Sequence, residues 1–274
     1  MRILDKQILT EAADTRIVRL KIDAAELSLK ARPGQFVVLM LSEYGERIPL
    51  TIVDTDNNAI TVIFQEAGLT TKMLAGLARE DELYALVGPL GKPTEIANFG
   101  KVILVGGGVG SAEIYPVARA LKAAGNNVTV VLGARNKSLL ILEQDFRMIS
   151  DQVFIATDDG SYGEKAFTTD ILERLLGESK YDLVYAVGPL AMMEKAAVVT
   201  KKYNVKTIVS LNALMVDATG MCGCCRVTVS GETKFSCVDG PEFNAHLVDW
   251  QELLKRNKAY VCQEKHICRL KLNG

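Results

Sequence analysis

The N-terminal part of the chain carries short runs of alternating or β-branched residues, which is the pattern of half-buried β-strands. The clearest runs are residues 15–22, 35–41 and 60–64. Turn-forming residues such as Pro33 and Gly34 separate them. One helix is expected, at about residues 70–77. Many short strands with little helix indicate a small antiparallel β barrel over residues 1–97.

Residues 98–210 show a different pattern, in which apolar strands alternate with helical stretches. Strands are expected at residues 101–105, 128–132, 153–156 and 183–187, and a helix at residues 111–124. This alternation predicts an α/β domain with a parallel, doubly wound sheet. Residues 211–274 are irregular and too few to build a core. We therefore expect a third region that needs an additional cross-link, such as a bound metal cluster, to be stable.

Composition and charge exclude some classes of function. The chain of 274 residues is 49% hydrophobic, which allows a sizeable core, and its formal net charge is −1. The chain therefore lacks the net positive charge that would attract nucleic acid. No apolar run approaches the length of about 18 residues that a membrane span needs. The N-terminal residues do not resemble a secretory signal, so a cytoplasmic protein without membrane or nucleic-acid partners is expected.

The most distinctive segment lies near the C-terminus and has the spacing Asp217-x4-Cys222-x2-Cys225-x11-Cys237. Plant-type ferredoxins hold a [2Fe–2S] cluster with a similar pattern of an x4 gap, an x2 gap and a long gap. Glycines such as Gly220 let the backbone wrap a cluster and expose amides that can donate to its sulfur atoms. An aspartate stands here where the first cysteine is expected.

Three other interpretations of this segment stay open. A zinc site would need a second cysteine pair or histidines at fixed spacing, whereas Cys237 is alone and His246 and His266 fall outside such spacings. A disulfide framework suits small secreted chains. Inert core thiols are the third interpretation, although they would not gather near glycines at one end of the chain. Iron–sulfur binding is the favoured interpretation. Inert buried thiols are the default for the remaining cysteines, Cys224, Cys262 and Cys268.

A glycine-rich turn at residues 106–110 lies between an expected strand and an expected helix. Backbone without side chains can approach a pyrophosphate there, and the helix N-terminus favours negative charge. The turn lacks the complete Gly-x-Gly-x-x-Gly fingerprint, so tight packing is the competing interpretation. Taken singly, residues 47–51 are typical of a strand edge, residues 68–71 of a helix start, and residues 188–192 of a turn into a helix.

The order of these motifs resembles the ferredoxin–NADP reductase superfamily over about the first 210 residues. That order is Arg-x-Pro-x-Thr, Gly-x-x-Thr, strand–Gly-Gly-Val-Gly–helix, and strand–Gly-Pro. With the Asp/Cys segment, the chain resembles a branch that joins an FAD barrel, a nicotinamide-nucleotide domain and a [2Fe–2S] site. The branch includes electron-transfer subunits of dihydroorotate dehydrogenase B, gamma subunits of sulfhydrogenases, and small subunits of NADH-dependent reduced ferredoxin:NADP oxidoreductase. The aspartate is most similar to the last group.

The resemblance implies a role for each matching position, without a catalytic acid or base. For FAD, Thr51 is similar to the hydroxyl residue beside the flavin N5 atom, Pro49 and Leu50 line the ring, Gly68, Thr70 and Thr71 form the pyrophosphate loop, and Arg47 is the candidate phosphate contact. For NAD(H), the loop matches Gly107, Gly108, Val109 and Gly110, and the turn facing the nicotinamide matches Gly188 and Pro189. The cluster-ligand positions match Asp217, Cys222, Cys225 and Cys237.

Several positions depart from the superfamily pattern. The usual arginine three places before the flavin hydroxyl is Ile48 here, and Arg47 comes one place earlier. A proline common soon after the glycine loop is Glu113, and a cysteine that often precedes Gly-Pro is Val187. Aspartate is a harder ligand than thiolate, so we hypothesise that Asp217 tunes the cluster potential or couples electron transfer to protonation.

The implied function is electron transfer between NAD(H), FAD and a [2Fe–2S] cluster. The implied partner is a larger flavin- and iron–sulfur-containing subunit, in a heterodimer that bifurcates electrons between ferredoxin and NADP. Alternatives are a subunit that serves dihydroorotate dehydrogenase or a sulfhydrogenase, a non-enzymatic redox sensor, and a zinc-stabilised nucleotide-binding module. The sequence leaves open the choice between NADH and NADPH, because Arg135 suits either a 2′-phosphate or a plain surface position.

Overall fold

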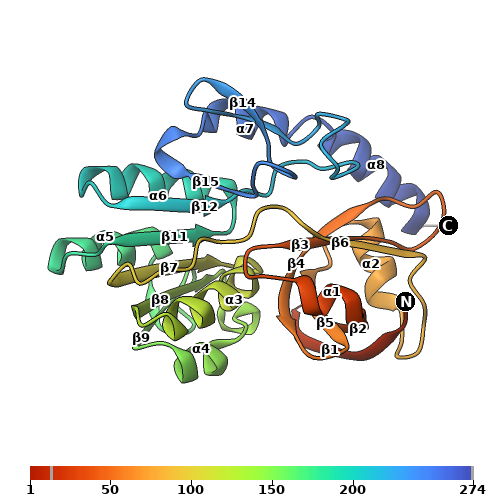
Figure 1. Ribbon diagram of the computed structural model, residues 1–274, viewed down its shortest axis with the longest axis horizontal. Coiled ribbons are helices and arrows are strands. Elements are labelled where there is room, and N and C mark those ends of the chain that lie inside the picture. The colour runs from red at the N-terminus through yellow and green to blue at the C-terminus, as the bar shows by residue number, and fades with distance from the viewer. Residues whose placement is uncertain (13–14, 273–274) are drawn as a thin grey trace.

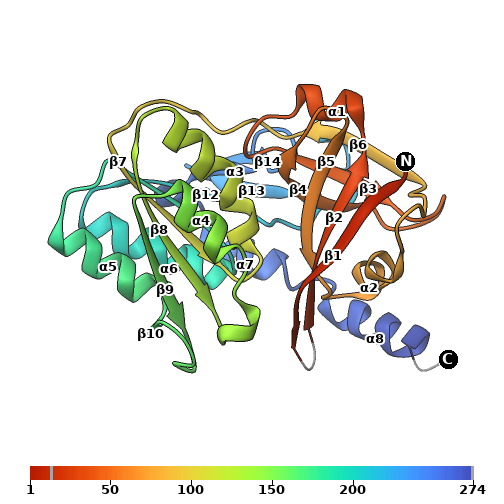
Figure 2. The same cartoon turned by 90° about the horizontal axis from the view of Figure 1, so that it is seen from below.

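The computed structural model describes residues 1–12 and 15–272, which form a barrel, an α/β domain and a C-terminal region that lies across both (Figures 1 and 2). The barrel strands are antiparallel in the order β1-β2-β5-β4-β3-β6. Its elements are β1 (Ile3–Ala12), β2 (Thr15–Asp23), α1 (Ala25–Lys30), β3 (Phe36–Met40), β4 (Ile48–Thr55), β5 (Ala59–Gln65), α2 (Leu69–Gly76) and β6 (Ala85–Leu90).

The first sheet closes because the segment before β6 pairs with the start of β1. The Ile3 amide donates to the Asp81 carbonyl at 2.9 Å, and the Leu83 amide donates to the Met1 carbonyl at 2.8 Å. Closure satisfies backbone groups that an open edge would leave unpaired. The predicted barrel is therefore confirmed, and the expected helix at residues 70–77 is α2.

Strand β3 is buried at every position, as its continuous apolar sequence predicts. Val37 and Leu39 point into the barrel core, whereas Phe36 and Val38 join a core that continues into the other two regions. Alternate side chains of one strand therefore belong to two cores. This arrangement fixes the barrel against the rest of the molecule through apolar packing.

The second sheet has seven strands in the order β10-β9-β8-β7-β11-β12-β15, and all pairs except β12–β15 are parallel. Its elements within residues 98–210 are β7 (Lys101–Gly107), α3 (Gly110–Ala123), β8 (Asn127–Ala134), η1 (Lys137–Leu139), α4 (Glu143–Ile149), β9 (Gln152–Thr157), β10 (Glu164–Lys165), α5 (Thr168–Glu178), β11 (Leu183–Val187), α6 (Leu190–Lys202) and β12 (Lys206–Ser210). The predicted doubly wound sheet is confirmed.

Helices cover both faces of this sheet. Val102 and Leu104 pack with α3 and α4 on one face, and Ile103 and Val105 pack with α5 and α6 on the other. Figure 2 shows α3 and α4 on the opposite side of the strands from α5 and α6. The strand order reverses between β7 and β11, and in such sheets a ligand binds beyond the carboxyl ends of the strands at that point.

The C-terminal region extends the second sheet and shares its core. It contains β13 (Arg226–Val229), β14 (Glu232–Phe235), β15 (Glu242–Asn244), η2 (Ala245–Leu247), α7 (Trp250–Arg256) and α8 (Val261–Leu272). Strand β15 pairs antiparallel with β12, and Val227 and Leu253 are buried in the core that contains α5 and α6. The region is therefore more regular than the irregular segment that its sequence suggests.

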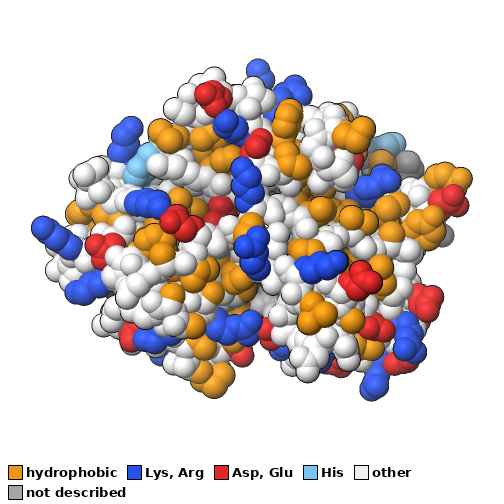
Figure 3. All heavy atoms as spheres, viewed as in Figure 1, with side chains coloured by type: hydrophobic (Ala, Val, Ile, Leu, Met, Phe, Trp, Pro, Cys, Tyr) orange, Lys and Arg blue, Asp and Glu red, His pale blue; other side chains and the backbone are white. Residues whose placement is uncertain are grey.

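The surface carries interspersed charges. Figure 3 shows acidic and basic side chains mixed over one face of the molecule. Within residues 1–12 and 15–272, no helix is both long enough and apolar enough to cross a membrane.

Candidate functional site

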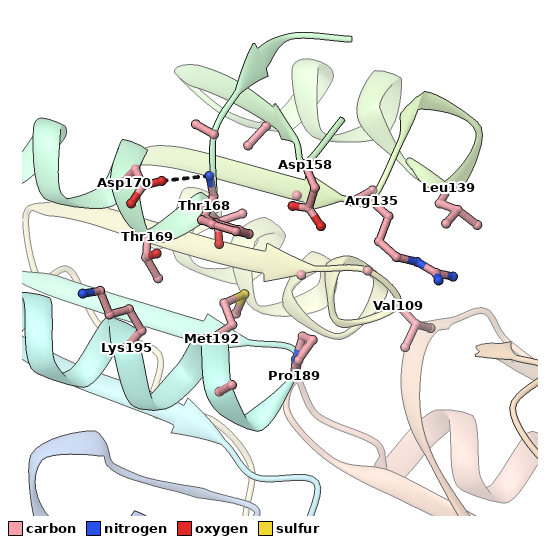
Figure 4. Close-up of a pocket in the computed structure, with 18 of the residues that line it drawn as sticks. Val109, Arg135, Leu139, Asp158, Thr168, Thr169, Asp170, Pro189, Met192 and Lys195 are labelled. Atoms are coloured by element: carbon pink, nitrogen blue, oxygen red, sulfur yellow. Dashed lines mark hydrogen bonds between the residues drawn. The ribbon is translucent and has the colours of Figure 1, made fainter. Parts of the chain in front are cut away.

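A cavity of about 890 Å³ opens at the carboxyl ends of the parallel strands, beside the β1–β2 hairpin of the barrel. Figure 4 shows its walls, which come from the ends of β7, β8 and β9 and from the first turns of α5 and α6. Thr15, Ile17 and Gln65 contribute the barrel side. The cavity therefore lies at the switch point of the sheet and between two domains, where nucleotides bind in doubly wound folds.

The glycine-rich turn forms part of the cavity wall. Gly107, Gly108 and Val109 line the cavity together with Pro189. Gly108 has φ +57, and a side chain added there would meet no atom within 4 Å. Its backbone is therefore open to a ligand and adopts a left-handed conformation that favours glycine.

Gly110 and Gly188 lie behind this wall and pack the two turns against each other. A Cβ atom on Gly110 would lie 2.5 Å from the Val187 carbonyl oxygen, and one on Gly188 would lie 3.1 Å from the Gly107 Cα. Close backbone packing therefore requires glycine at Gly110. The loop geometry is compatible with both interpretations, because one glycine is open to the cavity and another is required by packing.

Two helix N-termini border the cavity. Helix α3 begins at Gly110, directly after the glycine turn, and α5 begins at Thr168, which lines the cavity with Thr169 and Asp170. The Asp170 carboxylate accepts a hydrogen bond from the Phe167 amide at 3.0 Å. Free amides at helix N-termini attract phosphate, so this edge of the sheet suits a pyrophosphate.

Strand β4 carries the candidate flavin residues. Pro49, Leu50 and Thr51 are only partly buried, whereas the next residues of the strand enter the core. Arg47 lies just before the strand and is exposed. Thr51 faces the first turn of α3, where its hydroxyl hydrogen-bonds to the Glu113 carboxyl group. The seam between the barrel and the α/β domain thus holds a hydroxyl–carboxyl pair.

Glu113 has an unusual environment for an acidic residue. It follows the buried Ala112 and precedes the buried Ile114 in α3. Burial raises its pKa to about 7, and the hydrogen bond with Thr51 opposes part of that rise. Sequence reasoning noticed Glu113 only as a departure from a family pattern. Its contact with Thr51 joins residues 62 positions apart, for which the local sequence carries no signal.

The start of α2 is the second candidate flavin element. The Thr71 hydroxyl oxygen accepts hydrogen bonds from the amides of Ala67 and Gly68, at 3.0 and 2.9 Å. The Thr70 hydroxyl donates to the Glu46 carboxylate. Space beside Gly68 is open, because a Cβ atom there would meet nothing within 4 Å. The structure therefore brings the loop of Gly68, Thr70 and Thr71 to an accessible helix N-terminus.

The cluster-ligand candidates come together as two pairs. Asp217 Oδ1 lies 3.2 Å from Cys222 Sγ in an exposed loop. Cys225 Sγ lies 3.1 Å from Cys237 Sγ in the core, and both thiols are free. Two ligands of one tetrahedral metal lie about 3.3–3.8 Å apart when the bonds are about 2.0–2.3 Å. Each pair is therefore close to the separation expected of ligands that share one metal atom.

The two pairs together have the number of ligands that a binuclear cluster needs. Among the described residues, no group of three or more His, Cys, Asp or Glu side chains could hold one ion together. A [2Fe–2S] cluster needs two ligands on each of two irons. The donor set therefore fits the cluster that the sequence predicts.

The environments of the two pairs differ. Hydrogen bonds from the Thr219 amide and from Cys222 hold the pKa of Asp217 below its usual range. Burial and the Cys225 thiol raise the pKa of Cys237 to about 12.

Of the remaining cysteines, Cys224 is half-buried and Cys262 is exposed, so the default of buried thiols is wrong for Cys262. The side chain of Cys268 lies outside the described residues.

A buried polar junction links the three regions of the molecule. Tyr185 of β11 donates to Glu242 Oε1 at 2.6 Å, and Thr94, in the segment between β6 and β7, donates to the same oxygen. A Cβ atom on Gly34 of the barrel would lie 2.5 Å from that oxygen. Burial raises the pKa of Glu242, and the two hydroxyl donors oppose this rise. No pattern in the sequence predicts this junction.

Sequence reasoning also missed most of the far cavity wall. Besides Arg135, that wall includes Leu139, Asp158, Phe167, Thr168, Asp170, Met192 and Lys195. A usable signal existed, because Asp158 comes two residues after the expected third strand, and residues at the carboxyl ends of parallel strands face the ligand site.

Comparisons with known proteins agree with this arrangement. Residues 212–249 match the family described as the iron–sulfur cluster binding domain of dihydroorotate dehydrogenase B. A Thermotoga maritima protein, named as a homologue of the electron transfer subunit of dihydroorotate dehydrogenase B (NAD(+)), is 52% identical over 246 residues, which cover 89% of this chain and 87% of that protein. A protein from Clostridium beijerinckii, uncharacterised, is 42% identical over 277 residues, 96% of this chain and 91% of that protein.

A solved structure matches the whole chain. It is a chain from a study of flavin-based electron bifurcation in NADH-dependent reduced ferredoxin–NADP oxidoreductase, with a TM-score of 0.93 and 47% identity, covering 100% of this chain and 98% of that chain. The cytochrome P450 reductase GcoB of Amycolatopsis, at 22% identity and a TM-score of 0.59 over 74% of this chain and 65% of that one, shares the fold.

Proposed function

Because the chain belongs to the family of dihydroorotate dehydrogenase B electron-transfer subunits, we propose that it transfers electrons between NADH, FAD and a [2Fe–2S] cluster. We place this activity within a bifurcating ferredoxin:NADP oxidoreductase heterodimer. The chain matches the chain from that enzyme over its full length, from the barrel to the cluster loop. It is an oxidoreductase subunit with the ferredoxin–NADP reductase fold.

The observation that carries the proposal is that the buried ligand pair and the walls of the nucleotide cavity share one hydrophobic core. Cys225 and Cys237 are buried in the core that also contains α5 and α6, and α5 and α6 line the cavity. A cluster held there would keep a fixed relation to a nucleotide bound at the sheet edge. Electron transfer needs this kind of fixed positioning, because the protein orients the cofactors and the cofactors carry the chemistry.

The residues of this chain bind and orient. The open backbone at Gly108 lets a pyrophosphate approach the N-terminus of α3, while Pro189 shapes the end of the cavity beside the second turn. The proposed flavin contacts are Arg47, Pro49, Leu50, Thr51, Gly68, Thr70 and Thr71. When bound, FAD supplies hydride chemistry and the cluster supplies single-electron transfer. The proposed cluster ligands are Asp217, Cys222, Cys225 and Cys237.

A partner subunit follows from the same proposal. The exposed Asp217–Cys222 pair puts one side of the cluster site at the surface, where Met221 is 88% exposed. We propose that a larger flavin- and iron–sulfur-containing subunit covers this side in a heterodimer. Ferredoxin then interacts through that subunit, and the complex is cytoplasmic.

Cofactor content and partner identity test the proposal. Anaerobically purified protein should contain about two irons, two sulfides and one FAD per chain, and should reduce ferricyanide with NADH. Stoichiometric zinc without labile sulfide would overturn the cluster. The isolated chain should not couple NADPH oxidation to ferredoxin reduction, whereas the heterodimer should.

The second candidate function is that of an electron-transfer subunit of dihydroorotate dehydrogenase. It is favoured by the family matched over residues 212–249 and by the name of the Thermotoga maritima relative. Purification of a tagged chain from its own cells separates the two candidates. A partner that oxidises dihydroorotate would support the second candidate, whereas a partner that reduces ferredoxin from NADPH would support the first.

A further inference from the structure

The end of helix α7 contacts the cluster loop on both of its flanks. The Arg256 guanidinium donates through Nη2 to the Cys224 carbonyl at 3.1 Å. The next residue, Asn257, donates to the Asn212 carbonyl at 2.9 Å and accepts from the Leu214 amide at 3.2 Å. Asn212 and Leu214 precede the first proposed ligand, whereas Cys224 lies between the second and the third. The helix end therefore clamps the loop that carries the proposed ligands.

Helix α7 is itself held by contacts outside this loop. Leu253 is buried in the core that also contains the buried pair of proposed ligands. The Asp249 amide, at the start of the helix, donates to the Thr228 carbonyl of β13 at 2.8 Å. The position of Arg256 is therefore set by packing that does not depend on a bound metal. A side chain anchored in this way can orient and tune a metal site.

One hydrogen-bond donor of Arg256 lacks an acceptor. Its Nε atom is buried and has no hydrogen-bond partner among the described residues. A buried donor on a charged group is costly to leave unpaired, so such a donor normally has an acceptor. The sulfur atoms of an iron–sulfur cluster accept hydrogen bonds, and the Nη2 contact places this guanidinium beside Cys224, between two of the proposed ligands. The unpaired donor therefore fits a cluster held by this loop.

We propose that Arg256 sets the reduction potential of the [2Fe–2S] cluster by holding a positive charge and a hydrogen-bond donor beside it. The inference rests on the proposed function, because it assumes a cluster on Asp217, Cys222, Cys225 and Cys237. Reduction adds one electron to a centre whose proposed protein ligands are all anionic, so a nearby positive charge stabilises the reduced state. Arg256 thereby raises the potential and makes the cluster a better acceptor for an electron from the flavin.

A second arginine, Arg226, provides a comparison within the same loop. Its Nη1 atom donates to the Gly223 carbonyl at 3.2 Å, and this carbonyl is the neighbour of the one that Arg256 contacts. Arg226 is exposed, however, whereas Arg256 is half-buried. Water and salt screen an exposed charge more strongly than a partly buried one. The two arginines therefore bring the same charge to neighbouring carbonyls but should affect the cluster differently.

Redox titration of the anaerobic holoprotein, followed by EPR of the reduced cluster, tests the inference. Arg256→Gln should lower the equilibrium constant for cluster reduction about tenfold, which corresponds to about 59 mV for one electron. Arg256→Lys keeps the charge but lacks Nε and the planar fork, so its loss should be smaller, about threefold. Both shifts should persist at high salt, because the guanidinium is partly buried.

Two control variants make the result specific. Arg226→Gln removes the same charge from the exposed arginine and should leave the equilibrium constant within about twofold of wild type. Asn257→Ala breaks the other half of the clamp without a change in charge. It should lower the melting temperature, but the clusters that it retains should keep the wild-type potential. Iron, sulfide and FAD analysis shows separately whether each variant keeps its cofactors.

Three outcomes would overturn the inference. They are a wild-type potential in Arg256→Gln, an equal shift in Arg226→Gln, and an equal shift in Asn257→Ala. Loss of the cluster from both Arg256→Gln and Arg256→Lys would assign Arg256 a purely structural role and would overturn it as well. Wild-type protein without iron and labile sulfide is a different result, because it would overturn the proposed function itself.

Discussion

The nucleotide cavity and the cluster loop are built in different ways, although both are attached to the same hydrophobic core. The cavity wall rests on strands whose core side chains, such as Ile103 and Val105, are fully buried. Its two turns lock together because Gly110 leaves no room for a Cβ atom beside Val187. Apolar packing of the strands and close backbone contact between the turns therefore give the cavity its shape before any ligand binds.

The cluster loop is only half formed by its backbone. Cys225 and Cys237 are held in the core, but Asp217 and Cys222 lie in an exposed loop. That loop needs left-handed backbone at Ala218, with φ +59, which costs about 1–2 kcal/mol in a residue other than glycine. The comparison teaches that apolar packing preorganises the nucleotide site, whereas metal ligation must complete the cluster site.

Removal of a buried cluster ligand should have the largest effect. Cys225→Ser replaces a soft thiolate by a hydroxyl in the inner pair, so the cluster should be lost. Iron and sulfide should fall to background, and the apparent melting temperature should drop, because metal binding contributes to folding. FAD should remain bound, since the barrel has its own core. Iron and sulfide analysis, flavin absorbance and thermal melting measure these three outcomes.

The control for this prediction is Cys262→Ser, at an exposed cysteine of α8 outside the proposed ligand set. It should keep iron, sulfide and flavin at wild-type levels. If Cys225→Ser kept its cluster, or if it lost FAD together with the cluster, the proposed independence of the two sites would be wrong.

Changes at Asp217 should have a smaller and more selective effect. Asp217→Cys should keep the cluster and change its reduction potential and EPR g-values, because the ligand becomes softer. Asp217→Ala should destabilise the cluster less than Cys225→Ser does, because the buried pair remains. Potentiometry and EPR on anaerobic protein give the measurement. Wild-type spectra in both variants would remove Asp217 from the ligand set and make Cys224 the leading candidate.

A side chain at Gly110 should disturb the nucleotide cavity, which is the preformed site. Gly110→Ala would bring a Cβ atom to 2.5 Å from the Val187 carbonyl oxygen, so the two turns must separate. Overpacking of this kind costs about 1–3 kcal/mol and should weaken NAD⁺ binding. Denaturant unfolding and calorimetry measure the two effects. Gly76→Ala is the control, because a Cβ atom there would meet nothing within 4 Å; equal losses in both variants would contradict the packing argument.

The same contrast explains how much the sequence could predict. Strands such as β3 and β7 were readable because burial on both faces demands continuous apolar runs. The proposed ligand positions were readable because cluster chemistry restricts residue type and spacing. The three-residue strand β15 was not, since its pairing with β12 depends on tertiary position and not on any pattern in its sequence.

Contacts between distant residues were the other part that the sequence hid. Tyr185 and Glu242 are 57 positions apart and belong to different regions, yet they form a buried hydrogen bond. Local periodicity indicates which face of an element is buried. It does not indicate which polar group of a distant element contacts that face. For the same reason Arg135 and Asp158 line the same cavity only because β8 and β9 lie side by side.

The smallest predicted effect concerns Glu113, at the seam between the preformed cavity and the barrel. Its pKa is about 7 in the folded protein, against an ordinary value of 4.5. Between about pH 4.5 and 7 the folded state therefore binds a proton that the unfolded state has released, so stability falls as the pH rises through this window. Glu113→Gln removes this dependence. Relative to wild type, the variant should gain on the order of 2 kcal/mol between pH 5 and pH 8.

Denaturant unfolding of wild type and variant at several pH values between 5 and 8 provides the measurement, and the informative quantity is the change in their difference. Glu26→Gln is the control for the loss of a carboxylate at the surface, since the Glu26 side chain is 92% exposed. If the difference in free energy of unfolding between Glu113→Gln and wild type did not change with pH, the seam would hold an ordinary ionised carboxylate. The seam beside the cavity would then form without the cost of desolvating the Glu113 carboxylate, which the burial of Glu113 implies.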